Sequence, residues 1–317
     1  MSLPYRLLAR LLSPAGSRAR LSILIFHRVI PETDPLFPLE ATAASFDAQM
    51  GQVRQAFNVL PLPEAVARLK QGDLPARAAC ITFDDGYADN LTVAAPILRR
   101  HGLPATFFIA TAYLDGGRMF NDTVIEAIRR ARDARIDLTA LGLGEHDVST
   151  PAAKARAIGL ILPQVKYLPL GRREEVAADL AQRVADAPLP DDLMMTSAQV
   201  KELHGLGMEI GGHTHAHPIL AGLDDATVRA EIGAGRERLE ALLGDRVRVF
   251  AYPNGRPGQD YQPEQAALVR DMGFAGAVST QAGCATRASD PWQLPRFSPW
   301  NPARFMPMLV NNLRSPA

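Results

Sequence analysis

The stretch ACITFDDGYADNLTVAAPILRRH, residues 79–101, shows the pattern that recurs along this chain of 317 residues. Residues 79–83 form a short apolar run typical of a buried strand, and residues 90–101 have the apolar spacing of a helix. A strand followed by a helix within one unit is typical of parallel sheets, in which helices connect neighbouring strands. This stretch therefore indicates an α/β protein.

Similar strand-like runs occur elsewhere, at residues 21–29, 105–110, 208–212, 247–252, 275–279 and 293–297. Helix patterns lie between them, at residues 45–57, 62–70, 197–206, 224–243 and 263–272. This alternation is compatible with a barrel related to the eight-fold one or with an open doubly wound sheet. A barrel is favoured because no glycine-rich phosphate loop follows the first strand and because polar residues lie at several strand ends.

Residues 121–195 interrupt the alternation with helical patterns but no strand-like run. The helical patterns cover residues 123–132, 151–162 and 172–187. We therefore expect a helical insertion between two barrel strands, either a lid or substrate wall or an additional packed layer. The remainder of residues 21–317 would form the barrel domain, preceded by an N-terminal helical segment at residues 1–20.

Composition excludes some classes of protein. Lys plus Arg and Asp plus Glu both number 34, so the chain lacks the basic excess typical of nucleic-acid-binding proteins, and no nucleic-acid partner is expected. Two cysteines are too few for a disulfide framework. The apolar run around Cys80 predicts a buried and inert thiol.

The N-terminal stretch MSLPYRLLARLLSPAGSRARL has no uninterrupted apolar region, because Arg6 and Arg10 lie inside it. It is therefore unlike a signal peptide, and no apolar run in the sequence reaches the ~20 residues that span a bilayer. A cytoplasmic protein is the expectation. Residues 1–20 could form a surface helix packed on the domain, or a basic amphipathic helix that makes peripheral contact with anionic lipid.

Two carboxylates follow the strand-like run at residues 79–83. Asp84 and Asp85 come directly after it, and Gly86 turns the chain. Adjacent side chains at a strand end point in different directions, so one can bind a cation while the other faces the space beside it. A divalent ion would relieve the repulsion between them. A solvated Asp-Asp-Gly turn is the alternative that this segment alone leaves open.

Two histidines follow another strand-like run, in EIGGHTHAHPIL at residues 209–220. His213 and His217, four residues apart in a tight turn, would present their imidazoles on the same side. Pro218 disfavours a helical conformation at His217, so we expect a turn. His215, between the pair, should point elsewhere.

Asp85, His213 and His217 together make a set of two histidines and one carboxylate. Catalytic zinc sites have three such protein ligands and an open position for water or substrate. The ion polarises a carbonyl and lowers the pKa of bound water. Asp84 would then lie beside that water as the general base.

TFDDG at residues 82–86, followed at a distance by His-Thr-x-x-His at residues 213–217, resembles the polysaccharide deacetylase family, the NodB-homology carbohydrate esterases. The similarity extends to HGLPATFFIAT at residues 101–111 and FAYPNG at residues 250–255 and covers most of the chain. The resemblance implies a distorted (β/α)7 barrel, which agrees with the number of strand-like runs. It also implies a metal-dependent hydrolase that removes N-acetyl groups from a carbohydrate, in a setting such as exopolysaccharide biosynthesis.

The resemblance implies a role for each matching residue. Asp84 would be the catalytic base, and Asp85, His213 and His217 would bind a divalent metal, with Zn²⁺ as the expected ion. Thr214 matches a hydroxyl position that braces the metal loop.

The third motif of the family departs from the usual pattern here. It normally carries Arg, one residue, Pro and an aromatic, whereas residues 251–254 read AYPN and lack the arginine that would pair with the base. Arg296, at the end of a later short strand, could replace it, and Arg28 is a second candidate. The backbone N–H of Asn254 could still polarise the acetyl oxygen.

The family's late Leu-x-His motif, which supplies the general acid, is also absent, because no histidine follows His217. His27 lies at the end of the first strand-like run and could supply the acid. This would resemble a circularly permuted branch that includes poly-N-acetylglucosamine deacetylases. The competing interpretation is a half-buried strand histidine without a catalytic role.

Other functions remain open at this point. A catalytically silent homologue that binds metal or glycan is one, and a deacetylase of peptidoglycan or of a non-sugar amide is another. Asp84 favours an enzyme, because metal binding alone does not require it. Asp122 could line the cleft and Trp300 could stack on a sugar ring, but both are more simply explained as structural residues.

Overall fold

The computed structural model describes residues 3–299 and 301–317, so Trp300 lies outside the described residues. The chain forms two compact units. The first comprises Met1–Glu32, Leu39–Leu114 and Met195–Ala317, and the second comprises Thr33–Pro38 and Asp115–Met194.

Parallel strands of the first unit form a sheet in the order β1-β5-β6-β9-β10-β11-β12, and β4 (Asn58–Val59) pairs additionally with β5. The strands are β1 (Leu21–Phe26), β5 (Ala78–Phe83), β6 (Thr106–Ile109), β9 (Glu209–Gly212), β10 (Val249–Ala251), β11 (Gly276–Ala282) and β12 (Leu294–Arg296). The residue after β12 returns to β1, because the Phe297 N–H donates to the Ile23 carbonyl at 2.7 Å and the Phe297 carbonyl accepts from the Ile25 N–H at 3.0 Å. The sheet is thus a nearly closed barrel, as predicted, and not an open sheet.

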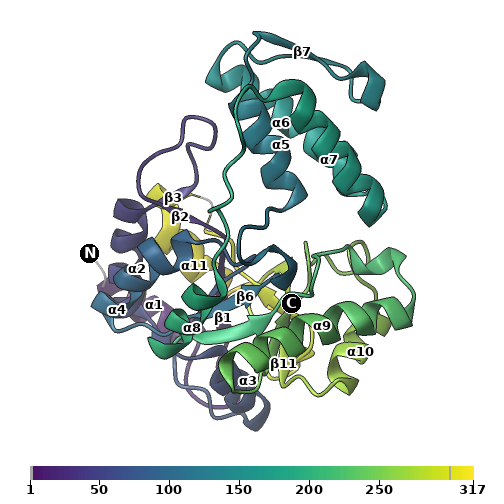
Figure 1. Cartoon of the computed structure of the whole chain (residues 1–317). Helices are drawn as coiled ribbons and strands as arrows, with labels where there is room; N and C mark the ends of the chain where they lie inside the picture. Colours follow the sequence, from purple (N-terminus) through teal and green to yellow (C-terminus); the bar gives the residue numbers. More distant parts are fainter. Residues whose placement is uncertain (1–2, 300) are drawn as a thin grey trace. The chain divides into compact units, whose positions relative to one another are not determined.

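Helices surround these strands (Figure 1). They are α2 (Ala43–Ala56), α3 (Leu62–Gln71), α4 (Ala95–His101), α8 (Ser197–Gly205), α9 (Asp225–Leu243) and α10 (Pro263–Asp271), and α4 continues the π-helical turn η1 (Asn90–Ala94). Each helix predicted between the barrel strands is therefore present. The last helix, α11 (Phe305–Asn312), was not predicted.

The first predicted strand is shorter than expected. β1 ends at Phe26, which pairs with Phe83, and the chain leaves the sheet at His27. The residues that follow form a separate short strand, β2 (Val29–Ile30), which pairs with β3 (Ala41–Thr42). His27 is therefore a residue of the barrel rim and not part of a continuous strand.

The barrel core is apolar at every position of β1 and β5 apart from Ser22 and Thr82. The rings of Phe83 and Phe107 stack with their centroids 4.6 Å apart, so side chains of the neighbouring strands β5 and β6 contact each other. Cys80 is fully buried in β5, and burial raises the pKa of its thiol, in agreement with an inert cysteine.

The second unit has an apolar core of its own. It contains α5 (Phe120–Arg129), α6 (Pro151–Lys166) and α7 (Leu170–Val184), as the helical patterns predicted. It also contains an antiparallel pair that was not predicted, β7 (Arg135–Asp137) with β8 (Glu145–Asp147). Residues 33–38, far away in sequence, belong to the same unit, where Asp34 receives two hydrogen bonds from Arg129.

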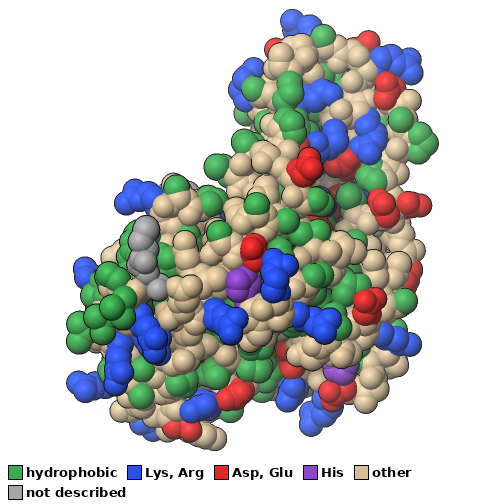
Figure 2. All heavy atoms as spheres, turned by 90° about the vertical axis from the view of Figure 1, so that its left-hand side faces the viewer, with side chains coloured by type: hydrophobic (Ala, Val, Ile, Leu, Met, Phe, Trp, Pro, Cys, Tyr) green, Lys and Arg blue, Asp and Glu red, His purple; other side chains and the backbone are tan. Residues whose placement is uncertain are grey.

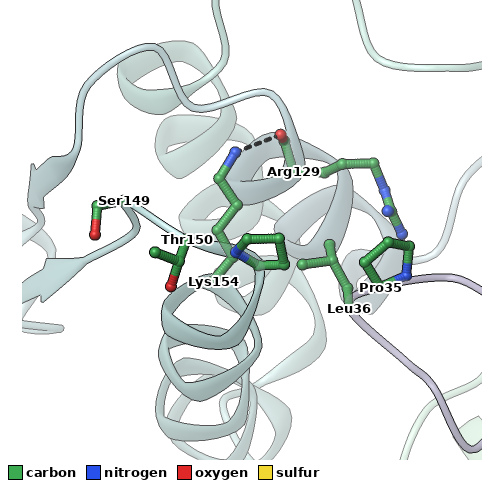
Figure 3. Close-up of a pocket in the computed structure, with 7 residues that line it drawn as sticks. Pro35, Leu36, Arg129, Ser149, Thr150 and Lys154 are labelled. Atoms are coloured by element: carbon green, nitrogen blue, oxygen red, sulfur yellow. Dashed lines mark hydrogen bonds between the residues drawn. The ribbon is translucent and has the colours of Figure 1, made fainter.

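A cavity of about 260 Å³ lies within this second unit (Figure 3). Its lining residues are Pro35, Leu36, Arg129, Ser149, Thr150, Pro151 and Lys154. Lys154 Nζ donates to the Arg129 carbonyl at 2.7 Å across one wall. The cavity contains none of the residues predicted for catalysis or metal binding.

The N-terminal helix α1 (Leu3–Leu12) packs against α2 and α11 of the first unit. Among the helices of the described residues, none is both long enough and apolar enough to cross a membrane.

Candidate metal centre

The candidate residues lie where parallel strands of the barrel end. His27 follows β1, Asp84 follows β5 and His213 follows β9. The Asp84 N–H donates to the Phe26 carbonyl at 3.0 Å, so Asp84 and His27 leave the sheet at the same level. The carboxyl ends of barrel strands form one rim, and side chains from different strands can meet there.

Backbone conformations at this rim are unusual. Asp85, Thr214, His217 and Asn254 have φ angles of 77°, 63°, 53° and 60°. The left-handed region costs a residue other than glycine about 1–3 kcal/mol and persists only where the surrounding structure imposes it. Such residues cluster at functional sites, and four candidate site residues share this feature here.

Asp85, His213 and His217 converge. All three are buried, and the ligand atoms that they offer lie within 4.8 Å of one another. Asp85 Oδ1 lies 3.3 Å from His213 Nε2 and 3.5 Å from His217 Nε2. Ligand atoms that bind tetrahedral zinc at about 2.0–2.2 Å are about 3.4 Å apart, so these distances fit one ion.

The tautomer of His213 also suits a metal ligand. Its Nδ1 lies 2.7 Å from the carbonyl oxygen of Ala251. Because a carbonyl can only accept, Nδ1 carries a hydrogen, and Nε2 is the ring nitrogen that faces Asp85 and the centre of the cluster. Metal-binding histidines commonly have their second nitrogen oriented in this way.

Thr214 braces the loop between the two histidines. Its hydroxyl donates to the His213 carbonyl at 2.6 Å and accepts from the His217 N–H at 3.0 Å. Residues 213–219 contain no helix, which confirms the turn predicted from Pro218. His215 does not join the cluster, because its Nδ1 lies 2.9 Å from the Thr111 hydroxyl.

Helix α9 supports the same loop, a feature that the sequence analysis missed. Glu231 Oε2 accepts from the backbone N–H groups of His215 and Ala216, at 3.2 and 2.8 Å. One turn later, a Cβ atom added to Gly235 would lie 2.6 Å from the Thr214 carbonyl oxygen. Only glycine allows the helix to approach so closely. In the sequence, the only indication of this close approach is a glycine within a helix pattern.

Asp84 points to Arg296 and not to the histidines. Two guanidinium nitrogens of Arg296 each donate to one carboxylate oxygen at 2.7 Å, and its Nε donates to the Ser279 carbonyl at 2.7 Å. Both side chains are buried. Burial alone would raise the pKa of Asp84, but the charge and hydrogen bonds of Arg296 outweigh it and hold the pKa below its usual range.

Asp85 is also held ionised, by different neighbours. Burial would raise its pKa, whereas the hydrogen bond with His213 and the positive charges of His27 and His217 lower it well below the usual range. The adjacent carboxylates of Asp84 and Asp85 thus point to different partners, as the sequence predicted for a strand end.

The two arginines considered as replacements lie in different places. Arg296 pairs with Asp84, whereas Arg28 donates through Nε to Asp89 at 2.7 Å. The guanidinium of Arg28 covers the ring of Tyr87, 4.9 Å from its centroid. The guanidinium that pairs with Asp84 is therefore that of Arg296, whereas Arg28 pairs with Asp89 and lies against Tyr87 in the segment after β5.

His27 is exposed at the rim, and its carbonyl accepts from the Asn90 side chain at 2.8 Å. Its positive charge is one of the influences that lower the pKa of both Asp84 and Asp85, after burial and closer partners. His27 is thus close to both carboxylates.

Asn254 lies in the segment after β10, and its carbonyl accepts from the Thr280 hydroxyl at 2.8 Å.

Comparison with known proteins agrees with this geometry. Residues 71–150 and 175–277 match the family model described as polysaccharide deacetylase. The YxkH protein of Bacillus subtilis (strain 168), whose name places it among polysaccharide deacetylases, is 22% identical over 280 residues, which are 88% of this chain and 71% of that protein.

Two solved structures share the fold. The Streptococcus pyogenes deacetylase PplD in complex with acetate is 19% identical with a TM-score of 0.62, and the match covers 93% of this chain and 98% of that one. IcaB from Ammonifex degensii is 18% identical with a TM-score of 0.58, over 96% of this chain and 99% of that one. The barrel is therefore of the NodB type. Because the family model matches more than half of the chain, this protein belongs to the polysaccharide deacetylase family, hydrolases that act on amide bonds in carbohydrates.

Proposed function

We propose that this protein is a metal-dependent N-deacetylase of an acetylated polysaccharide or oligosaccharide and that its ion is zinc. The observation that carries the proposal is the pairing of Asp84 with Arg296 beside the cluster of Asp85, His213 and His217. Metal binding needs only the cluster. A buried carboxylate held ionised next to it is what hydrolysis additionally needs.

The cluster would hold the ion through Asp85, His213 and His217. When bound, the ion would polarise the acetyl carbonyl and lower the pKa of a water molecule. The protein contributes the fixed geometry: Ala251 orients one imidazole, and Thr214 holds the loop that carries both. A preorganised set of ligands needs little rearrangement during the reaction.

Asp84 would act as the base. Arg296 donates to both carboxylate oxygens, so the side chain has one defined orientation and stays charged near neutral pH. Each oxygen keeps a further lone pair, and one of these can accept the proton of the attacking water.

His27 would act as the acid. An amine leaves a tetrahedral intermediate poorly unless its nitrogen is protonated as the C–N bond breaks. His27 is exposed at the rim, close to both carboxylates, so we assign to its ring the proton that the leaving nitrogen receives. We assign to Asn254 a supporting part, in which its backbone N–H donates to the acetyl oxygen. The resulting arrangement resembles the circularly permuted branch of the family.

The solved structure of PplD contains acetate, the product that hydrolysis of an N-acetyl group releases. This supports an N-acetylated substrate for the present chain as well. The IcaB-like fold supports a setting in exopolysaccharide biosynthesis. A silent homologue is disfavoured, because the chain keeps Asp84 and supplies it with a guanidinium partner from a new position, Arg296.

Acetate release from an N-acetylated chitooligosaccharide, with the protein loaded with zinc, tests the proposal. Asp84→Asn should keep its metal content but lose roughly 10²–10⁴ in turnover, the usual contribution of a general base. Asp271→Asn, at the exposed end of α10, is the matched control and should behave as wild type. A zinc-loaded wild-type protein that releases no acetate from acetylated sugars or peptidoglycan fragments would support the silent homologue. Near-normal turnover of Asp84→Asn would remove Asp84 as the base.

A further inference from the structure

Helix α1 has two apolar faces, and the barrel covers only one of them. Ala9 is fully buried, and Tyr5, Leu8 and Leu12 pack against the core of the first unit. These four positions have the spacing of one helical face. Packing against α2 and α11 therefore accounts for four of the apolar residues of α1.

The remaining leucines of α1 face solvent. Leu3, Leu7 and Leu11 are 65%, 56% and 79% exposed. They are four residues apart and therefore form one continuous stripe along the helix, which we call the leucine stripe. Isolated exposed leucines are ordinary, but a contiguous apolar stripe on a surface helix marks a contact surface.

Basic side chains border the leucine stripe. Arg6 and Arg10 are exposed on the same helix. Burial and the like charges of these two residues lower the pKa of Arg77, which shows that all three guanidinium groups lie near one another. The described residues before Glu32 include no acidic side chain, whereas the whole chain has no net charge. Figure 2, which faces the side of Figure 1 that carries α1, shows hydrophobic side chains gathered beside Lys and Arg side chains.

We infer that α1 docks on an anionic membrane surface, with the leucine stripe inserted among the lipids and Arg6 and Arg10 at the phosphate groups. A helix with leucines beside arginines is the usual composition of an interfacial helix that lies in the membrane plane. Each basic residue near an anionic surface strengthens the attachment. Because α1 is anchored to α2 and α11, docking would hold the barrel at the surface without a spanning segment. This inference does not depend on the proposed function.

Co-sedimentation of the full chain with vesicles tests the inference. Wild type should bind vesicles of phosphatidylglycerol and phosphatidylcholine and bind pure phosphatidylcholine more weakly. Leu7→Ser/Leu11→Ser should reduce binding about tenfold or more, because the apolar contact is lost. Arg6→Gln/Arg10→Gln should reduce binding to the anionic vesicles and make it insensitive to salt. Leu160→Ser, which changes a leucine that is 61% exposed on α6, is the matched control and should bind as wild type.

Two further measurements make the outcome decisive. All variants should keep the wild-type melting temperature and acetate release from a soluble substrate, since the changed side chains face solvent and lie outside the metal centre. Loss of vesicle binding with both values unchanged supports the inference. Absence of vesicle binding by wild type, or equal binding by Leu7→Ser/Leu11→Ser, would overturn it. A wild-type dimer that dissociates in this double variant would show that a second copy covers the leucine stripe.

Discussion

At the scale of single residues, the pair of Asp84 and Arg296 combines catalysis with stability. Both side chains are buried, so neither charge can be solvated by water if its partner is removed. The guanidinium of Arg296 keeps the Asp84 carboxylate ionised at the metal centre, and no other buried cation pairs with that carboxylate among the described residues.

Arg296→Met should therefore destabilise the fold by about 3–5 kcal/mol, the typical effect of leaving one buried charge without its partner. Urea unfolding measures this difference. The control is Arg248→Met, which breaks an ion pair with Glu209 whose arginine side chain is 54% exposed, and it should cost less than about 1 kcal/mol. Equal losses in the two variants would mean that the buried pair has no special energetic importance.

His27→Ala tests a side chain that contributes chemistry but little packing. His27 is exposed, so the variant should fold and should bind zinc as wild type does. Acetate release should fall by roughly 10²–10⁴, because no acid then protonates the leaving amine. His204→Ala, which removes a histidine that is 35% exposed and paired with Asp245, should keep full activity. Full activity of His27→Ala would leave the acid to another group and favour a different mechanism.

At the scale of elements, the metal loop depends on its contact with α9. Glu231 holds two backbone N–H groups of the loop, and Gly235 lets the helix reach the Thr214 carbonyl. The positive φ angles of Thr214 and His217 are thereby supported from outside the loop.

Gly235→Ala should disturb this contact, because its Cβ would lie 2.6 Å from a backbone oxygen that cannot rotate away. We expect a loss of about 1–3 kcal/mol in stability, as for overpacked sites, together with weaker zinc binding. Gly233→Ala lies on the same helix, and its Cβ would meet only Met272 Cε at 4.0 Å. This control should gain about 0.5–1 kcal/mol from helix propensity. Zinc titration and urea unfolding of both variants decide the matter, and unchanged zinc affinity in Gly235→Ala would show that α9 does not position the loop.

At the scale of the whole molecule, the metal centre joins the ends of β5 and β9, which are not neighbours in the sheet order. An ion bound there would link segments that are distant in sequence, and it would do so in the native state only. A ligand that binds only the native state raises the free energy of unfolding with the logarithm of its concentration, once that concentration exceeds Kd.

Zinc at about one hundred times its Kd should therefore stabilise the protein by about 2.7 kcal/mol, and a chelator should reverse the gain and abolish acetate release. Thermal unfolding with and without zinc measures this. Asp85→Ala removes one of three ligands and should lose the thermal shift as well as activity. An undiminished shift in Asp85→Ala would place the stabilising ion elsewhere on the protein.

The barrel strands and the segments that end in candidate ligands could be predicted from the sequence. Periodicity, capping and turn residues act over a few positions, so the runs that became β1, β5 and β9 could be recognised locally. The same holds for Asp84, Asp85, His213 and His217, because a strand end followed by a short motif is a local feature.

The side chains that complete these motifs could not be predicted, because they come from distant parts of the sequence. Arg296 meets Asp84 across a separation of 212 residues, and no local pattern distinguished it from Arg28. Glu231 and Gly235 support the metal loop through a packing contact that exists only once α9 lies against the barrel. The pairing of β7 with β8 has a different cause, because strands of three residues are too short to show an apolar alternation. Contacts between residues distant in sequence depend on how the sheet closes and where its helices pack. Both are determined by the packing of the whole chain.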